Sequence, residues 1–216
     1  MKNYFLKALM IIPMALLMSC SQDNESSNTT NDEAISFQNL TFNETNAYFS
    51  SDGSMSAPVN ESQAAAMPHH IDITFIYNYD YFEPGFFDPK ARSQDWYWDD
   101  YHESWLSTAV ETQYYATTLT KADFDAAATQ ESLIAEYFAE TTTVLAPHAI
   151  FPTGSCVGGR ESYDPLSVLL TEGAVFGFKN VSSGKRGLIY IRTDQSPAWP
   201  IAFADSNTKV DLIREN

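Results

Sequence analysis

The segment AVFGFKNVSSGKRGLIYIRT, residues 174–193, decides the fold class of this chain. Its two halves are rich in β-branched and aromatic residues, and a Ser-Ser-Gly turn separates them. Side chains alternate between the two faces of a strand, so Phe176 and Phe178 share one side of the first half and Ile189 and Ile191 share one side of the second. This pattern predicts a β-hairpin.

Other strand-like segments lie towards both ends of the chain. They are residues 35–42, residues 46–50, which we expect to pair with the first segment, residues 71–79, and residues 209–214. Segment 71–79 is nearly apolar throughout, so we expect it in the centre of a sheet. Segment 80–94 contains two prolines and a glycine and is predicted to be a long loop.

Helices are predicted in the middle of the chain. The expected ranges are residues 61–67, a helix from Asp99 or Asp100 to Tyr115, and a region 121–140 that breaks near Thr129. Thr120 and Asp123 have the spacing of a capping box. Strands, then helices, then strands predict a single α+β domain, with a largely antiparallel sheet and two or three helices inserted between N-terminal and C-terminal strands.

The first residues have the layout of an export signal. Lys2 and Lys7 precede an apolar run from Ala8 to Met18, and the chain turns polar after Cys20. The run is well short of the roughly 20 residues that a membrane-spanning helix needs, and Pro13 interrupts it. We therefore expect a cleaved signal and no transmembrane helix.

Residues 17–20, Leu-Met-Ser-Cys, resemble the bacterial lipobox, in which the cysteine is lipidated and becomes the new N-terminus. The resemblance implies a signal peptide over 1–19 and a lipid on Cys20. Acyl chains stabilise membrane attachment by about 0.8 kcal/mol per buried methylene, so such an anchor needs no membrane-spanning segment.

The segment after the anchor is polar and acidic. Residues 21–33 contain no apolar side chain, so we expect 20–33 to be a lipidated, flexible acidic stalk in front of a single domain over 34–216. Asp23 and Glu25 resemble the acidic surface-export signal of Bacteroides-like lipoproteins. We expect an outer-membrane, lipid-anchored protein at the cell surface, with the periplasmic face as the alternative.

Composition limits the partners. The chain has 12 basic and 28 acidic residues, a net charge of −16, and removing Lys2 and Lys7 with the signal leaves 10 minus 28, or −18. A field of this sign repels phosphate backbones and anionic headgroups, which argues against nucleic acid and against a polybasic membrane patch. Lipidation of Cys20 leaves Cys156 without a partner, so we expect no disulfide.

Scattered strand and turn residues carry a wider resemblance. They are Ile71-Asp72-Ile73, Gly173, Phe178-Lys179, Gly184-Lys185, Gly187-Leu188-Ile189 and Lys209-Val210. In these residues the chain resembles uncharacterised lipoproteins of Bacteroides-like gut bacteria. The resemblance implies a cell-surface setting and no particular reaction.

Aromatic residues are concentrated before the middle of the chain. The candidate ligand-binding residues are Trp96, Tyr97, Trp98, Tyr101 and Trp105, and carboxylates are interleaved with them. Flat rings cover the apolar faces of sugars while carboxylates bind the hydroxyls, so the segment predicts a glycan or glycopeptide site. In the alternative interpretation Trp98, Tyr101 and Trp105 face the core at helical spacing, with the acids in water.

Signs of catalysis are weak. Residues 154–158 have the spacing of a nucleophile elbow with Cys156 in the nucleophile's place and His148 nearby in the sequence. Pro152 falls in the required strand and Pro165 cuts the required helix short, so the sequence favours a buried, inert cysteine. We therefore assign no catalytic residue.

Metal and cofactor motifs are missing too. The four histidines form no His-x-x-x-His pair, and the acidic cluster around Asp99 lacks the central glycine of an EF-hand, which leaves calcium as a minor alternative. We expect no metal and no cofactor. The first hypothesis is a surface lipoprotein that binds a glycan, the second an accessory subunit of an envelope complex, and the third a hydrolase.

Overall fold

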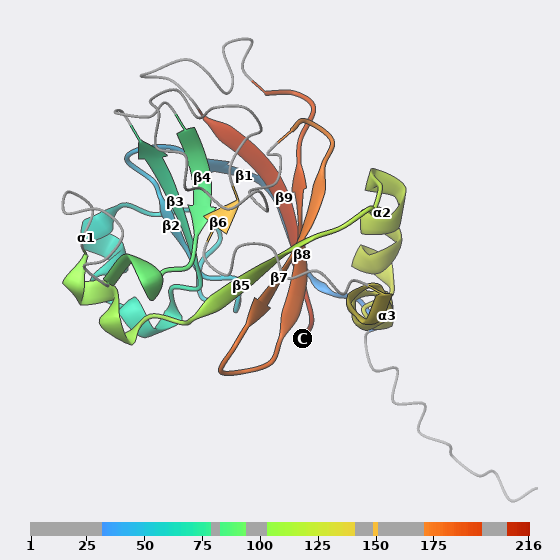
Figure 1. Ribbon diagram of the computed structural model, residues 1–216, viewed down its shortest axis with the longest axis horizontal. Coiled ribbons are helices and arrows are strands. Elements are labelled where there is room, and N and C mark those ends of the chain that lie inside the picture. The colour runs from blue at the N-terminus through green and yellow to red at the C-terminus, as the bar shows by residue number, and fades with distance from the viewer. Residues whose placement is uncertain (1–31, 79–82, 94–102, 141–148, 151–170, 196–206) are drawn as a thin grey trace, which may run out of the picture. The chain divides into compact units, whose positions relative to one another are not determined.

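The computed structural model describes residues 32–78, 83–93, 103–140, 149–150, 171–195 and 207–216. The chain divides into the units Met1–Thr30 and Asn31–Asn216, and every described residue lies in the second. This second unit is an α+β domain with antiparallel sheets and helices, as the sequence predicted (Figure 1).

The larger sheet contains the predicted hairpin. Its five strands follow the order β1-β9-β8-β7-β5, and all neighbours are antiparallel. Their bounds are β1 (Ile35–Phe42), β9 (Thr208–Arg214), β8 (Arg186–Ile191), β7 (Val175–Asn180) and β5 (Thr112–Ala116). The first and last strands are neighbours, with Ile35 opposite Arg214 and Phe42 opposite Thr208. The domain therefore begins and ends at the same end of this sheet.

The smaller sheet corrects two predictions. Its order is β2 (Tyr48–Phe49), β3 (Ile73–Asn78), β4 (Glu83–Phe87) and β6 (Ala149–Ile150), which confirms a central place for β3. Segment 46–50 was expected to pair with 35–42, but β2 pairs with β3. The predicted loop 80–94 contains β4, which tolerates Pro84 because β6 pairs only with Phe86 and Phe87.

The described helices are short. They are α1 (Glu61–Ala64), α2 (Lys121–Thr129) and α3 (Ser132–Glu140), with the 3₁₀ turns η1 (Pro68–His70), η2 (Ala91–Ser93) and η3 (Ser104–Thr108). The capping box at α2 is confirmed, because Thr120 accepts from Asp123 N and its own N–H donates to Asp123 Oδ2 at 2.7 Å. The expected break near Thr129 separates α2 from α3.

The helix predicted to run to Tyr115 is wrong in its described part. Residues 104–108 form η3, and residues 112–116 form β5 on the edge of the larger sheet. Val110 N donates a hydrogen bond to Ile71 O. Thr112 and Tyr114, two positions apart, are both fully buried, so side-chain burial follows the two-residue period of a strand. Pairing with β7 outweighs the local helical spacing of the aromatic residues.

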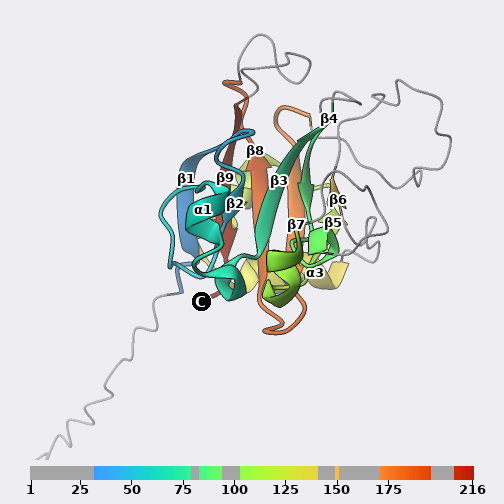
Figure 2. The same ribbon diagram turned by 90° about the vertical axis from the view of Figure 1, so that its left-hand side faces the viewer.

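Two apolar clusters organise the layers. The first lies between the sheets and includes Phe42, Phe75 and Phe86, whose rings pack at centroid distances of 5.1 to 5.9 Å. The second lies on the other face of the larger sheet, where α2 and α3 cover it with Phe124 and Ile134. Figures 1 and 2 show the resulting order of smaller sheet, larger sheet and helices.

Candidate functional site

One of the five candidate aromatic residues lies in the described part of the chain. Trp105 stands on η3, is half-buried, and its ring centroid is 5.1 Å from that of Tyr48. Its indole Nε1 is buried and has no hydrogen-bond partner among the described residues. The other four, Trp96, Tyr97, Trp98 and Tyr101, lie outside the described residues, as does Cys20.

A polar cluster of Tyr48, Arg92 and Glu103 lies beside Trp105, and we call it the base cluster. Arg92 Nη2 donates to Glu103 Oε1 at 2.7 Å, and the Tyr48 hydroxyl donates to the same oxygen. The guanidinium carbon of Arg92 is 5.2 Å from the centre of the Tyr48 ring. The Arg92 and Glu103 side chains are only 6% and 17% exposed, so this ion pair is largely shielded from water.

The base cluster fixes the two ends of the aromatic stretch. Arg92 lies in η2, just before residues 94–102, and Glu103 directly follows them. Glu103 N donates to Arg92 O at 3.0 Å, which adds a main-chain bond to the ion pair. The described chain therefore stops after Ser93 and resumes at Glu103 beside the same ion pair.

Burial also determines the protonation state of Tyr48. Desolvation raises the pKa of the Tyr48 hydroxyl well above its usual range, and the Glu103 carboxylate raises it further while Arg92 opposes the change. The hydroxyl stays protonated at physiological pH and remains a hydrogen-bond donor to Glu103. The base cluster is therefore a structural clamp in which a protonated Tyr48 and Arg92 both donate to Glu103.

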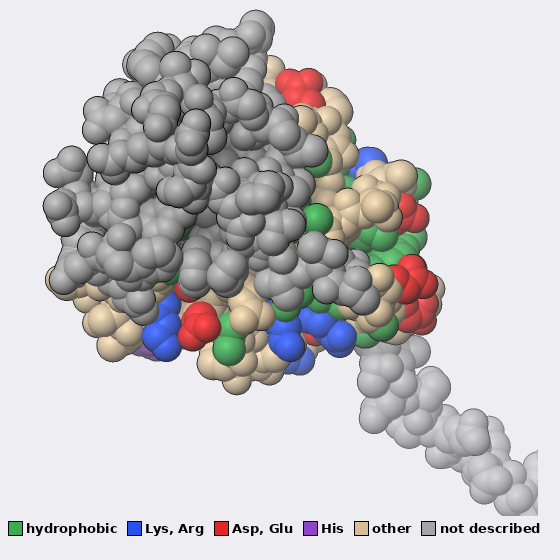
Figure 3. Space-filling model, viewed as in Figure 1, with side chains coloured by type: hydrophobic (Ala, Val, Ile, Leu, Met, Phe, Trp, Pro, Cys, Tyr) green, Lys and Arg blue, Asp and Glu red, His purple; other side chains and the backbone are tan. Residues whose placement is uncertain are grey.

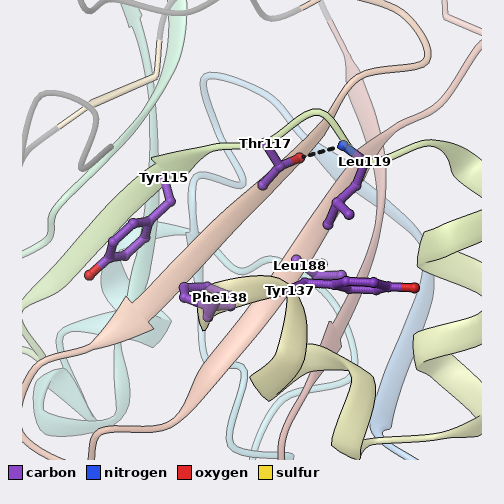
Figure 4. Close-up of a pocket in the computed structure, with 6 residues that line it drawn as sticks. All are labelled: Tyr115, Thr117, Leu119, Tyr137, Phe138 and Leu188. Carbon is purple, nitrogen blue, oxygen red and sulfur yellow. Dashed lines mark hydrogen bonds between the residues drawn. The ribbon is translucent and has the colours of Figure 1, made fainter. Parts of the chain in front are cut away.

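A second aromatic surface lies on the helix-covered side of the larger sheet. Tyr115, Thr117 and Leu119 from β5 and the segment after it face Tyr137 and Phe138 of α3, over Leu188 (Figure 4). They line a shallow hollow that opens to solvent. The hollow has no interior space large enough for a water molecule, so its rings are closely packed and it is not a small-molecule site.

Close packing shapes this hollow. The Tyr115 and Phe138 rings meet edge to face at 5.1 Å, and the Arg186 guanidinium lies 5.9 Å from the centre of the Phe138 ring. A Cβ on Gly177 would come within 2.8 Å of Phe138 Cζ, so a larger residue there would displace the ring. Aromatic faces and a cation are thus held together at one edge of the helix layer.

A buried polar network links the two sheets. Asp72, which is 1% exposed, accepts hydrogen bonds from Ser51 N at 2.8 Å, Ser51 Oγ at 2.5 Å and Asn180 Nδ2 at 3.0 Å. Desolvation raises the pKa of this carboxyl, while its hydrogen bonds and the charge of Arg214 oppose that shift. Because Ser51 and Thr112 are fully buried, the network is sealed and serves to join the sheets.

The described residues contain no group of three His, Cys, Asp or Glu side chains that could hold a metal ion. Cys156 and His148, the weak candidates for nucleophilic chemistry, lie outside the described residues. Within the described ranges, no helix has the length and apolar character needed to cross a bilayer.

Comparison with known proteins gives no relative. No protein-family model, no curated protein and no solved structure matches the chain. The chemistry of its own residues therefore carries the functional argument.

Sequence reasoning missed the base cluster and the hollow beneath α3. Tyr48 is 44 positions from Arg92 and 55 from Glu103, and no motif links them. The signal available was a lone arginine and a lone glutamate on either side of the aromatic stretch, at 92 and 103. Residues of opposite charge on the two sides of an aromatic stretch can therefore be tested as an ion pair that joins the ends of the stretch.

Proposed function

We propose that this protein is a lipid-anchored outer-membrane protein, displayed at the cell surface, that binds a glycan or glycopeptide without chemical turnover. The ligand is bound by the aromatic and acidic stretch from Trp96 to Trp105, and the folded domain holds that stretch in place.

The observation that carries this proposal is the base cluster. A shielded ion pair and a main-chain hydrogen bond join Arg92 to Glu103 on either side of residues 94–102. Fixing both ends of a segment lowers the conformational entropy that it loses on binding, and pre-organisation of this kind raises affinity.

Composition supports a sugar as the ligand. Residues 95–102, DWYWDDYH, supply four aromatic rings together with three carboxylates and one imidazole. Sugar rings present apolar C–H faces and a rim of hydroxyls, and this combination complements both. The net charge of −16 favours a neutral ligand over an acidic polymer.

Binding is tested with the chain from Asn31, which contains the whole compact unit. Tryptophan fluorescence is recorded across a panel of neutral and acidic glycans. We expect a neutral glycan to change the emission and Trp96→Ala to abolish the response. Tyr137→Ala, in the hollow under α3, is the matched aromatic control and should leave binding intact. No response across the panel, or a response that survives Trp96→Ala, would contradict the proposal.

The anchor is tested separately in the producing cell. We expect labelled palmitate to be incorporated into the full chain and lost in Cys20→Ala, and protease added to intact cells to remove the domain. Label retained by Cys20→Ala would overturn the lipid site, and complete protection from protease would overturn surface display. Co-purification of a stoichiometric envelope partner, with no glycan bound, would favour an accessory subunit instead.

A further inference from the structure

Two buried hydrogen-bond donors without acceptors lie at the base cluster. Arg92 Nε and Trp105 Nε1 are both buried, and neither has a hydrogen-bond partner among the described residues. A third such nitrogen, Arg214 Nε, belongs to β9 in the larger sheet. Buried polar groups of folded proteins are nearly always paired, because an unpaired donor destabilises the folded state. Two of them in one place therefore call for an acceptor.

Both donors belong to side chains that contact the same ring. The guanidinium carbon of Arg92 is 5.2 Å from the centre of the Tyr48 ring, and the centroid of the Trp105 ring is 5.1 Å from it. The main chain also brings the two together, because Glu103 N donates to Arg92 O and Trp105 follows Glu103 by two positions. The two donors therefore form one local group around Tyr48.

The other nitrogens of Arg92 are already hydrogen-bonded. Nη2 donates to Glu103 Oε1 at 2.7 Å, and Nη1 donates to Phe75 O at 3.4 Å. The Arg92 side chain is only 6% exposed, so bulk water does not supply an acceptor to Nε. Trp105 as a whole is half-buried, although its Nε1 is buried. The partly exposed indole is therefore the part of this group that a ligand can approach.

The charges around the donors favour a neutral acceptor. Glu103 already balances the charge of Arg92, so an incoming carboxylate would meet the Glu103 carboxylate with no further cation to offset it. A hydroxyl would accept a hydrogen bond but would bring a donor hydrogen of its own. An uncharged carbonyl oxygen only accepts, and its two lone pairs can serve two N–H groups.

Charges on the surface also suit a neutral ligand. Figure 3 shows cationic and anionic side chains beside one another along the lower edge of one face. Lys90 with Glu111 and Arg186 with Glu215 are described pairs of this kind. Alternating charges do not produce the field of one sign that concentrates a charged ligand.

We propose that Trp105 and Arg92 form an acetamido subsite, in which Trp105 Nε1 donates to the carbonyl oxygen of an N-acetylhexosamine and Arg92 Nε is the second donor. This inference deepens the proposed function and rests on it. Among the uncharged substituents of common sugars, the acetamido group supplies such a carbonyl oxygen. Its methyl group is apolar and packs against the indole ring of Trp105.

Matched pairs of sugars test the subsite. The chain from Asn31 is titrated, with tryptophan fluorescence as the signal, against oligomers of N-acetylglucosamine and of glucose of equal length and linkage. Oligomers of N-acetylgalactosamine and of galactose form the second pair. In at least one pair we expect the acetylated member to bind at least about tenfold more tightly, because a buried donor then gains an acceptor.

Two variants remove one donor each. Trp105→Phe keeps an aromatic ring without its N–H, and Arg92→Lys keeps a cation beside Glu103 without Nε. We expect Trp105→Phe to reduce the preference for the acetylated sugar to about threefold or less, and Arg92→Lys to reduce it in the same direction. The matched control is Tyr115→Phe, which removes a hydroxyl that donates to Gln113 at 3.1 Å and should keep the full preference.

Nuclear magnetic resonance of the unaltered sequence gives a result that does not depend on the folding of a variant. The tryptophan side chains are labelled with nitrogen-15, and the indole signal of Trp105 is assigned from its cross-peaks to the nearby Tyr48 ring. We expect its N–H proton signal to move downfield on addition of the acetylated sugar, because a hydrogen bond then forms, and to move less with the parent hexose.

The outcomes separate this inference from the proposed function. Equal affinity within both pairs, a preference unchanged in Trp105→Phe, a preference lost in Tyr115→Phe, or a Trp105 signal that stays fixed on binding would each overturn the acetamido subsite and leave glycan binding standing. Absence of binding to every sugar would overturn both.

Discussion

The ion pair between Arg92 and Glu103 should be one of the most sensitive points of the domain. Arg92→Met keeps the aliphatic volume of the side chain but leaves the Glu103 carboxylate, which is 17% exposed, without its cation. Removing one partner of a buried pair destabilises a protein by about 3–5 kcal/mol, because the remaining charge stays desolvated. The Tyr48 hydroxyl still donates to the carboxylate, so we expect the lower end, about 3 kcal/mol.

That loss is measurable in two ways. For a domain of this size each kcal/mol lowers the melting temperature by about 2–4 °C, so Arg92→Met should lower it by roughly 6–12 °C. Urea unfolding of the chain from Asn31, followed by tryptophan fluorescence, gives the free energy of unfolding directly. Glu103→Gln keeps an oxygen for both donors and should cost less, about 1–2 kcal/mol.

A double-mutant cycle separates the ion pair from general packing. Arg92→Met combined with Glu103→Met removes both charges, and we expect a coupling energy of at least about 2 kcal/mol. The control is Lys90→Met, which breaks the exposed pair with Glu111 and should cost no more than about 0.5 kcal/mol. A cost below about 1 kcal/mol for Arg92→Met, together with additive effects of the two changes, would refute the stabilising role of the base cluster.

Three further predictions concern stability and ligand binding. Gly187→Ala places a Cβ 2.4 Å from Ile213 O and from the Phe178 ring, so it should cost at least about 3 kcal/mol in urea unfolding; an effect within 1 kcal/mol would refute this packing. Asp72 has a raised pKa in the folded state, so its contribution to stability is full below about pH 3.9, the unfolded value, and declines as pH rises through the folded pKa. Asp72→Asn should flatten this part of the stability profile above about pH 4, and an unchanged slope would contradict the assignment. Arg92→Met should weaken glycan binding in fluorescence titrations at temperatures where the domain stays folded, and unchanged affinity would separate the clamp from binding.

Sequence patterns were sufficient to predict the elements whose stabilising interactions join residues close together in the chain. The hairpin of β7 and β8 was predictable because its strands are adjacent in sequence, are rich in β-branched and aromatic residues and are joined by a short turn. The capping box before α2 was predictable for the same reason, since its side-chain hydrogen bonds join Thr120 to Asp123, three positions along the chain. In both cases the deciding interactions span few residues.

Long-range partners explain the failures. Segment 46–50 pairs with β3, about 25 positions later, although its composition suits pairing with the adjacent β1 equally well. The helical spacing of residues 99–115 is real, but β7, more than 60 positions away, offers β5 a full ladder and a buried place for Tyr114. A single sequence does not show whether a local helical pattern or pairing with a distant strand is the more favourable.

Only part of the candidate site could be predicted from the sequence, for the same reason. The rings and carboxylates of the aromatic stretch are local and therefore legible in the sequence. What would make them a site is the joining of Arg92 to Glu103 across the stretch and the placing of Tyr48 beneath that pair, and Tyr48 comes from β2 in the smaller sheet. Because β2 is fixed there by β3, damage to the β2–β3 pairing should loosen the clamp without touching any ligand-binding residue. Binding and sheet stability are therefore expected to change together in variants of the smaller sheet.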